Sequence, residues 1–304
     1  MLKHLAFKSH LQKKYYKVFN PLQATLLLSL CAIFAAMDCA KKGSGKNTAL
    51  IFDSIPVSHA VVPVIEEGSG IADSKLNPGN IWVEEDSDNP PQILLMKHDG
   101  TVVKKIFIHG AVNRDWEDIA LYDDTIYIAD IGDNDQKYKS YTFYIFPEPL
   151  ASADTVKNSR AVSFMYPDGS HNAEAFLLDQ KSHDLYIITK TDNPSRIYKL
   201  SYPYSSSMNI LTLEGKLNYS GVVSAASSSD DKEVIVKTYL ALKYYQRKSN
   251  QSITECLTQS PRMLPYTPEP QGEAICFAND TSGFFTLSEK GLASFVNLYF
   301  YPRK

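Results

Sequence analysis

The chain has 304 residues, of which 44% are hydrophobic and 12% aromatic, and its formal net charge is −3. This composition excludes collagen-like, coiled-coil and highly charged disordered chains. The length allows two domains, but a single all-β domain often reaches about 250 residues, so length alone does not set the number of domains. The first fifty residues differ in character from the rest.

The N-terminal segment has the pattern of a secretory signal. Residues 1–20 contain five Lys and no acidic residue, and residues 22–37 (LQATLLLSLCAIFAAM) form an apolar run. A basic segment followed by a short apolar run is typical of a signal peptide, whereas a helix that spans a bilayer needs about 20 apolar residues. We therefore predict a signal peptide over residues 1–38, with a tilted or shortened membrane span as the alternative.

A cysteine and a short polar segment follow the apolar run. Residues 39–46 read CAKKGSGK, which resembles the start of a mature bacterial lipoprotein, where a Cys takes the lipid and a polar tether follows. The resemblance implies lipidation of Cys39, with Cys31 as the alternative, and a flexible tether over residues 39–48. Two acyl chains anchor a protein stably without a spanning helix. We therefore expect an exported protein, anchored by lipid on the periplasmic or cell-surface side of a bacterial membrane.

The chain that follows the signal peptide is acidic. Removal of residues 1–38 leaves 26 basic and 33 acidic residues and a net charge of −7. Such a surface binds polyanions poorly, and no Lys/Arg run occurs after Lys46, so we do not expect a nucleic acid as partner. The expected partner is a small molecule, a saccharide or an envelope protein. We expect a monomer that meets the membrane only through its N-terminal anchor.

Two cysteines, Cys256 and Cys276, remain as thiols in the mature chain. They either form a disulfide or serve as small buried residues, and Cys276 lies in the apolar run Ala-Ile-Cys-Phe. No CxxC or HxH pair occurs, so a structural zinc site has little support.

From residue 51 onward, short runs rich in Ile, Val, Tyr and Phe alternate with turns rich in Asp, Asn, Gly, Pro and Ser. This pattern predicts successive β-strands and no convincing helix. A two-strand unit recurs about every fifty residues, which is a repeat length typical of propellers. Its first strands begin near Gly70, Trp116, Ala173, Val223 and Gly272. Each unit has room for two more strands, and four strands make one propeller blade.

We therefore predict an all-β fold, a single β-propeller over residues 49–304 with five blades, or six if a long connection contains another. The last unit lacks one strand, and an unassigned strand (residues 50–57) lies at the other end of the domain. Pairing of this N-terminal strand into the last blade would close the ring and remove an exposed edge. An open stack of hairpins or a β-sandwich is the alternative.

Several motifs in these repeats are similar to those of a known family. They are WEDIA at residues 116–120, ADIGDN at 129–134, NAEA at 172–175 and QGEA at 271–274. Over about residues 65 to 301 the chain resembles a family of exported bacterial β-propeller-like lipoproteins. The resemblance implies the fold and export, and it implies no particular activity. Ala226 and the segment from residue 241 to 267 depart from the family pattern.

Three glutamates, Glu117, Glu174 and Glu273, occupy matching positions at the start of the first strand of their units. The first strand of a propeller blade lines the central channel, so we expect these side chains to converge on the axis. Oxygen-rich clusters suit Ca²⁺, which takes six to eight oxygen ligands. We therefore predict the three glutamates as metal ligands. Other ligand-binding candidates lie at or just beyond strand ends: Asp118, Asp130, Asn134 and Glu289.

The alternative for these acidic residues is an architectural role. Each Glu would then pair with a backbone N–H or a basic side chain and lock neighbouring blades together. The candidate basic partners are Arg114, Lys190, Arg196 and Lys237. The stretch from Asp130 to Asn134 is first of all interpreted as a turn, in which Gly132 relieves a restricted φ.

Large aromatic side chains offer a second kind of binding surface, because their rigid faces stack on sugars. Packing between blades is the commoner use of such residues. The candidates are Trp82, Trp116, Tyr244 and Tyr245.

Two functions are consistent with these features. The first is an exported, lipid-anchored binding or interaction module whose loops at one face of the ring hold an unknown ligand. The second is a Ca²⁺-assisted hydrolase of a lactone or phosphoester, in which the axial ion polarises the ester oxygen and His171 or Asp133 is the general base. We place the binding module first because no catalytic nucleophile or base is independently indicated, and fold alone does not imply function.

Overall fold

The structure is a computed structural model that describes residues 50–304. The predicted signal peptide, the predicted lipidation site Cys39 and the predicted tether therefore lie outside the described residues. Regular structure within residues 50–304 is almost entirely β, as the alternating pattern predicted. No helix in this part of the chain is long and apolar enough to span a bilayer.

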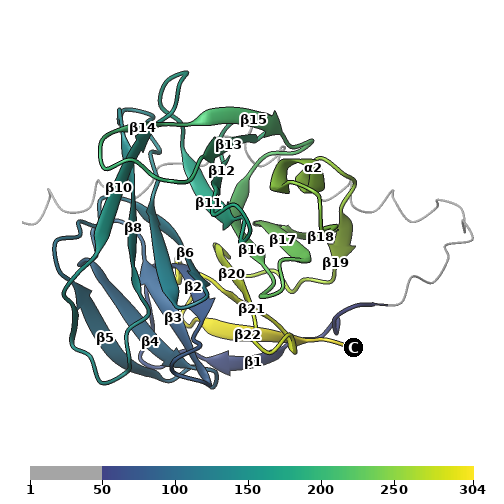
Figure 1. The fold of residues 1–304 in the computed structure, drawn as a ribbon. Helices are drawn as coiled ribbons and strands as arrows, with labels where there is room; N and C mark the ends of the chain where they lie inside the picture. Colours follow the sequence, from purple (N-terminus) through teal and green to yellow (C-terminus); the bar gives the residue numbers. More distant parts are fainter. Residues whose placement is uncertain (1–49) are drawn as a thin grey trace, which may run out of the picture. The chain divides into compact units, whose positions relative to one another are not determined.

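The strands form five sheets around a central axis, so the predicted five-bladed β-propeller is confirmed (Figure 1). Blade 1 consists of β2 (Gly68–Asp73), β3 (Asn80–Glu85), β4 (Gln92–Lys97), β5 (Val102–Ile108) and β9 (Thr155–Val156). Blade 2 consists of β6 (Trp116–Tyr122), β7 (Thr125–Asp130), β8 (Tyr141–Pro147), β10 (Arg160–Met165) and β14 (Asn209–Ile210).

The other three blades have four strands each. Blade 3 consists of β11 (Ala173–Leu178), β12 (Leu185–Thr189), β13 (Arg196–Leu200) and β15 (Thr212–Lys216). Blade 4 consists of β16 (Val222–Ser227), β17 (Glu233–Thr238), β18 (Ala241–Gln246) and β19 (Arg262–Leu264). Blade 5 consists of β20 (Ala274–Phe277), β21 (Gly283–Leu287), β22 (Asn297–Pro302) and β1 (Val57–Ala60).

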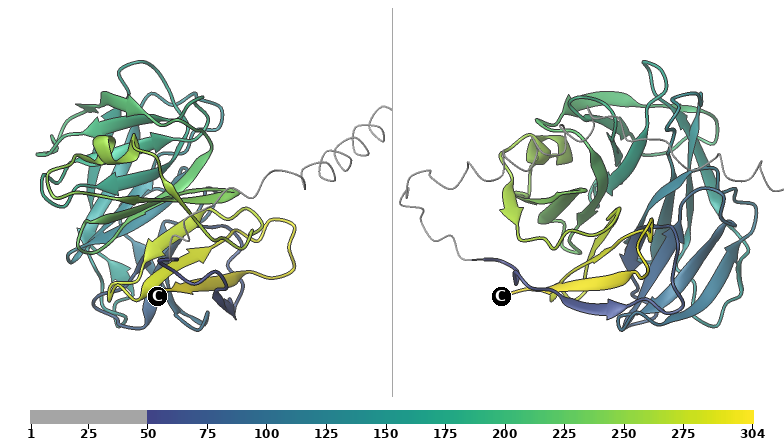
Figure 2. Two further views of the ribbon diagram at one scale, coloured as in Figure 1. Left: turned by 90° about the vertical axis from the view of Figure 1, so that its right-hand side faces the viewer. Right: turned by 180° about the vertical axis from the view of Figure 1, so that it is seen from behind.

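The ring is closed by the N-terminal strand, as predicted. Strand β1 pairs antiparallel with β22, so that Val57 lies opposite Phe300. The strand begins later than expected, because Pro56 has no N–H to donate to a β-ladder. Ahead of it, Phe52 forms only an isolated bridge with Arg303. The last blade thus combines both ends of the described chain (Figure 2).

Two short strands cross to the preceding blade. Strand β9 lies between β8 and β10 in the sequence, yet it pairs in parallel with β5, the outer strand of blade 1. In the same way β14 pairs in parallel with β10, the outer strand of blade 2. These contacts cover edges that would otherwise expose unpaired backbone groups.

Five hydrophobic clusters hold the blades together, one between each pair of neighbours. The predicted use of the large aromatic residues in packing is borne out, since all four are buried: Trp82, Trp116, Tyr244 and Tyr245. The two cysteines are both buried and free, and they lie in different clusters. The disulfide alternative is therefore wrong for Cys256 and Cys276.

One helix in the described residues was not expected. Helix α2 (Ile253–Leu257) lies between β18 and β19, in the segment that departs from the family pattern. Ser252 and Glu255 form a capping box at its N-terminus, and Ile253, Cys256 and Leu257 are buried. A five-residue helix is too short to show a helical period, which is why the sequence pattern did not reveal it.

Candidate functional site

A repeated irregularity points side chains toward the axis at one end of the channel. The innermost strands β2, β6, β11 and β16 each carry a β-bulge near their start, at Ser69, Glu117, Glu174 and Val223. Bulges bend a strand and re-aim a side chain. In blade 5, Glu273 lies directly before the innermost strand β20. The three glutamates predicted to match therefore occupy equivalent places around one mouth of the channel.

A second set of residues lies at the same mouth. Asp86, Lys190 and Tyr239 directly follow the second strands of blades 1, 3 and 4, and Glu289 lies two residues after that of blade 5. Asp115 directly precedes β6, the innermost strand of blade 2. We call this end of the channel, with its two sets of residues, the acidic mouth.

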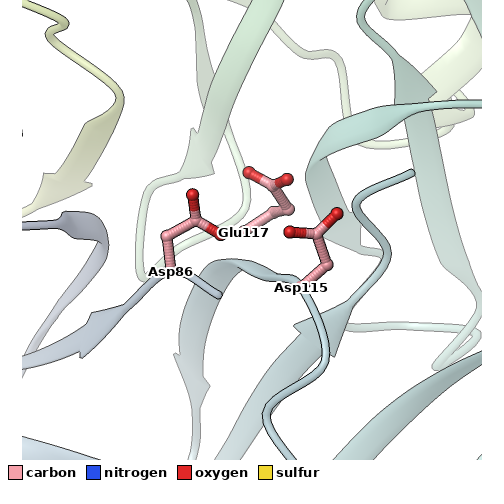
Figure 3. Close-up of side chains that lie close together, drawn as sticks. All are labelled: Asp86, Asp115 and Glu117. Carbon is pink, nitrogen blue, oxygen red and sulfur yellow. The ribbon is translucent and has the colours of Figure 1, made fainter. Parts of the chain in front are cut away.

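Three carboxylates of the acidic mouth face one another without a basic residue between them. Asp86, Asp115 and Glu117 each present one oxygen, and these oxygens lie within 4.8 Å of one another (Figure 3). Gly132 makes this approach possible, because a Cβ there would overlap Glu117 Oε1 and lie 2.5 Å from Asp115 Oδ2. The φ of Gly132 is not in the left-handed region, so the expectation that Gly132 relieves a restricted φ is wrong. Its role is to leave room for the two carboxylates.

The other half of the acidic mouth contains an ammonium group. Lys190 Nζ donates to Glu174 Oε1 and to the Tyr239 hydroxyl (2.9 Å), and it lies 3.7 Å from Glu273 Oε1. The Tyr239 hydroxyl donates in turn to Glu273. The other oxygen of Glu174, Oε2, is buried and has no hydrogen-bond partner among the described residues.

Burial and like charges make full ionisation of this cluster unfavourable. Burial, together with Glu174, Asp86 and Asp115, raises the pKa of Glu117 well above its usual value. Burial and neighbouring carboxylates raise the pKa of Asp86 to about 7 and that of Glu174 to about 8. Burial and Glu273 raise the pKa of Glu289 to about 9. Such a group of acids needs protons or a cation.

Lys190 is the exception in this cluster, because its charged form is stabilised. Burial opposes the ammonium, but Glu174, Tyr239 and Glu273 together raise the pKa of Lys190 above its usual value. The residue therefore remains a cation throughout the neutral range.

The predicted ligand-binding residues Asp118 and Asp130 have structural contacts. Asp118 accepts hydrogen bonds from Ile119 N (3.1 Å), Phe176 N (3.3 Å) and Ser224 Oγ (3.4 Å), and so ties blades 2, 3 and 4 together across the channel. Asp130 accepts from Asp115 N at 3.0 Å, which fixes the segment that brings Asp115 to the site.

The remaining two ligand-binding candidates make polar contacts of different kinds. Asn134 accepts a hydrogen bond from Asn172 Nδ2 at 3.1 Å, which joins the ADIGDN loop to the NAEA motif. Glu289 accepts from Gln271 Nε2 at 2.7 Å and belongs to the acidic mouth through its coupling to Glu273.

The two candidates for a general base are engaged elsewhere. The ring nitrogens of His171 lie 2.9 Å from Asp192 Oδ2 and 3.2 Å from Asp168 Oδ1. Asp133 accepts from the backbone N–H groups of Lys137 and Tyr138 and from the Tyr141 hydroxyl (2.8 Å), and so closes its own turn. The contacts of both side chains support a role in holding loops.

Within the described residues, Lys190 is the only one of the four predicted basic partners that contacts a predicted metal ligand. Arg114 lies 3.6 Å from Asp130, Arg196 lies 2.7 Å from Asp168, and Lys237 lies 2.6 Å from Glu269. The architectural alternative therefore describes Glu174 and Glu273, which share Lys190, better than it describes Glu117.

Sequence reasoning missed Asp86, Asp115, Tyr239 and Glu84. The first three flank strands that had been recognised, so alignment of the position just after each second strand would have found Asp86 and Tyr239. Glu84 lies fully buried on β3, and neither of its carboxylate oxygens has a hydrogen-bond partner among the described residues. Gly70 leaves room for it, because a Cβ there would lie 2.7 Å from Glu84 Oε1.

Comparison with known proteins adds little to this picture. No protein-family model matches the chain, and no curated protein sequence is significantly similar to it. Among solved structures, the chain is similar to a luciferin-regenerating enzyme, with a TM-score of 0.49 and 9% identity. That match covers 81% of this chain and 95% of the other chain. The propeller assignment accordingly rests on the sheet topology.

Proposed function

We propose that this protein is an exported, lipid-anchored binding module whose ligand site is the acidic mouth, and that the site takes a divalent cation, preferably Ca²⁺. The observation that carries the proposal is the approach of Asp86, Asp115 and Glu117 to within 4.8 Å of one another. Ligand oxygens lie about 2.3–2.6 Å from a bound Ca²⁺, so two ligands of one ion lie at most about 5 Å apart. The three carboxylates satisfy this condition.

A separate observation also supports a bound ion. Glu174 is almost fully buried, and its Oε2 has no hydrogen-bond partner among the described residues. An unpaired buried carboxylate oxygen is costly, and coordination to a cation would remove that cost. The charge of Glu174 also raises the pKa of Glu117, and the charge of Asp86 raises the pKa of Glu174.

The chemistry of the donors favours Ca²⁺ over transition metals. All candidate ligands are carboxylate oxygens, with no His or Cys in the group. Hard oxygen ligands suit Ca²⁺ and Mg²⁺, and Ca²⁺ tolerates irregular geometry that Mg²⁺ does not.

The contacts of the candidate bases favour binding over hydrolysis. A general base must be within reach of a water or substrate at the ion. His171 is instead held by Asp168 and Asp192, and Asp133 is held by the Lys137 and Tyr138 backbone and the Tyr141 hydroxyl. A bound ion would therefore serve to hold a small molecule, a saccharide or an envelope protein at this face of the propeller.

Thermal melting of metal-stripped protein, titrated with Ca²⁺, tests this proposal. A ligand that binds only the native state at 100 times its Kd stabilises it by about 2.7 kcal/mol. Since 1 kcal/mol corresponds to roughly 2–4 °C for a domain of this size, we expect the Tm to rise by about 5–11 °C.

The variant Glu117→Gln should lose most of this rise and Glu174→Gln a smaller part of it, while Asp124→Asn, which changes an exposed residue on the β6–β7 turn, should keep it. If Ca²⁺ leaves the Tm of the wild-type protein unchanged, the acidic mouth is not a cation site. The ligand search would then turn to saccharides and envelope proteins.

A further inference from the structure

We infer that Lys190 is a built-in cation that fills the Glu174–Glu273 half of the acidic mouth and confines an incoming divalent ion to the Asp86–Asp115–Glu117 half. The inference rests on the proposed cation site. It identifies Lys190 as the residue that sets how many divalent ions the site binds and how tightly it binds them.

The place of Lys190 in the propeller supports this role. In the strand register, Glu85 pairs with Gly68 in blade 1, and Thr189 pairs with Ala173 in blade 3. Asp86 and Lys190, the residues that directly follow these two strands, therefore occupy equivalent positions in their blades. One structural position thus supplies an acid on one side of the acidic mouth and a base on the other.

The contacts of Lys190 hold its ammonium at the centre of the second half. It donates to Glu174 and to the Tyr239 hydroxyl, and the same hydroxyl donates to Glu273. The Lys190 side chain is only 20% exposed, so its charge is partly shielded from solvent. Tyr239 thereby positions the ammonium between the two glutamates.

Glu174 interacts with both halves, because it binds Lys190 and its charge raises the pKa of Glu117. Glu174 Oε1 accepts from Lys190, whereas its Oε2 has no hydrogen-bond partner among the described residues. Removal of the ammonium would leave Glu174, Glu273 and Glu289 as a second group of acids that lacks a cation. A fixed positive charge in this position repels a divalent ion, and the repulsion is strong where the groups are partly buried.

Calorimetric titration with Ca²⁺ tests the inference. The proteins are the wild type, Lys190→Met, Tyr239→Phe and the control Lys232→Met, which removes an exposed lysine paired with Asp230. We expect Lys190→Met to bind Ca²⁺ about tenfold more tightly or to take a second equivalent, because one repelling charge is gone. Tyr239→Phe should have a smaller effect in the same direction, and Lys232→Met should match the wild type.

The outcomes separate this inference from the proposed function. If the wild type binds Ca²⁺ and Lys190→Met binds the same number of ions with equal or lower affinity, the role assigned to Lys190 is wrong and the cation site stands. If the wild type does not bind Ca²⁺ but Lys190→Met does, Lys190 blocks the whole site, and the proposed function of the wild-type protein is wrong. If neither binds, both are overturned. Should Lys190→Met fail to fold, Tyr239→Phe decides, since unchanged binding by that variant contradicts the inference.

Discussion

Replacement of Asp86 by Asn distinguishes a ligand site from a structural cluster, because the two roles predict opposite changes in stability. If the carboxylate of Asp86 mainly repels Asp115 and Glu117, its neutralisation stabilises the cation-free protein. If it is an architectural partner, the same change destabilises the fold. Ligand sites are commonly retained at some cost in stability, so we expect the first result.

The magnitude follows from the geometry of the cluster. Two unit charges 4.8 Å apart repel by about 3.5 kcal/mol at an effective dielectric constant of 20. Separately, a pKa raised from 3.8 to about 7 corresponds to about 4 kcal/mol once Asp86 is ionised in both states. Solvent screens this partly exposed side chain, so we expect about 2 kcal/mol. That stabilisation would raise the Tm by roughly 4–8 °C.

The size of this stabilisation depends on pH in a defined way. The pKa of Asp86 is higher in the folded than in the unfolded state, so the folded state binds the proton more tightly. The destabilising effect is therefore absent below the unfolded pKa of 3.8, grows as the pH rises, and is complete above about 7. The advantage of Asp86→Asn should accordingly be largest at pH 8 and less than half as large at about pH 5.

The assay is thermal melting of both proteins with a chelator present, at each of these pH values. Asp88→Asn is the matched control, since Asp88 is exposed and lies only two residues away. A lower Tm for Asp86→Asn at the higher pH would refute the reasoning, as would an advantage of equal size at both pH values.

Three further predictions follow from the described contacts. Gly132→Ala should abolish the Ca²⁺-dependent rise in Tm without removing a carboxylate, because its Cβ would displace Asp115 and Glu117; melting with and without Ca²⁺ checks this. Lys237→Met should cost about 3–5 kcal/mol in urea unfolding, because it leaves Glu269 buried without its cation, and the added change Glu269→Gln should recover part of the loss. Burial raises the pKa of Cys256 to about 11, so this thiol should react with a thiol reagent at pH 8 only after unfolding, as peptide mapping would show.

The repeat in the sequence was sufficient to predict the five blades and the closing strand, because each unit reproduces the same strands and turns. It was also sufficient to bring Glu117, Glu174 and Glu273 to one mouth, since equivalent positions in a propeller lie around one axis. The β-bulges that aim Glu117 and Glu174 were not predictable, because a bulge appears only in the pairing of two strands.

Other parts of the site depend on contacts between distant segments. Asp115 reaches the cluster because Asp130, on the next strand, holds its backbone, and because Gly132 leaves room. The engagement of His171 depends on Asp192, which comes from the connection after β12. No local pattern contains such information, so neither the membership of the cluster nor the state of the candidate base could be predicted.

The closing strand also determines how the domain would respond to force. The chain enters the propeller next to its last residues, where Lys304 N donates to Ile51 O (2.9 Å) and Asp53 N donates to Pro302 O (2.8 Å). Any tension carried by the preceding segment, such as the pull of a lipid anchor, would act first on these bonds and then on the pairing of β1 with β22. Detachment of β1 would reopen the ring and leave the last blade with three strands, so the mechanical strength of the domain depends on a four-residue strand at its edge.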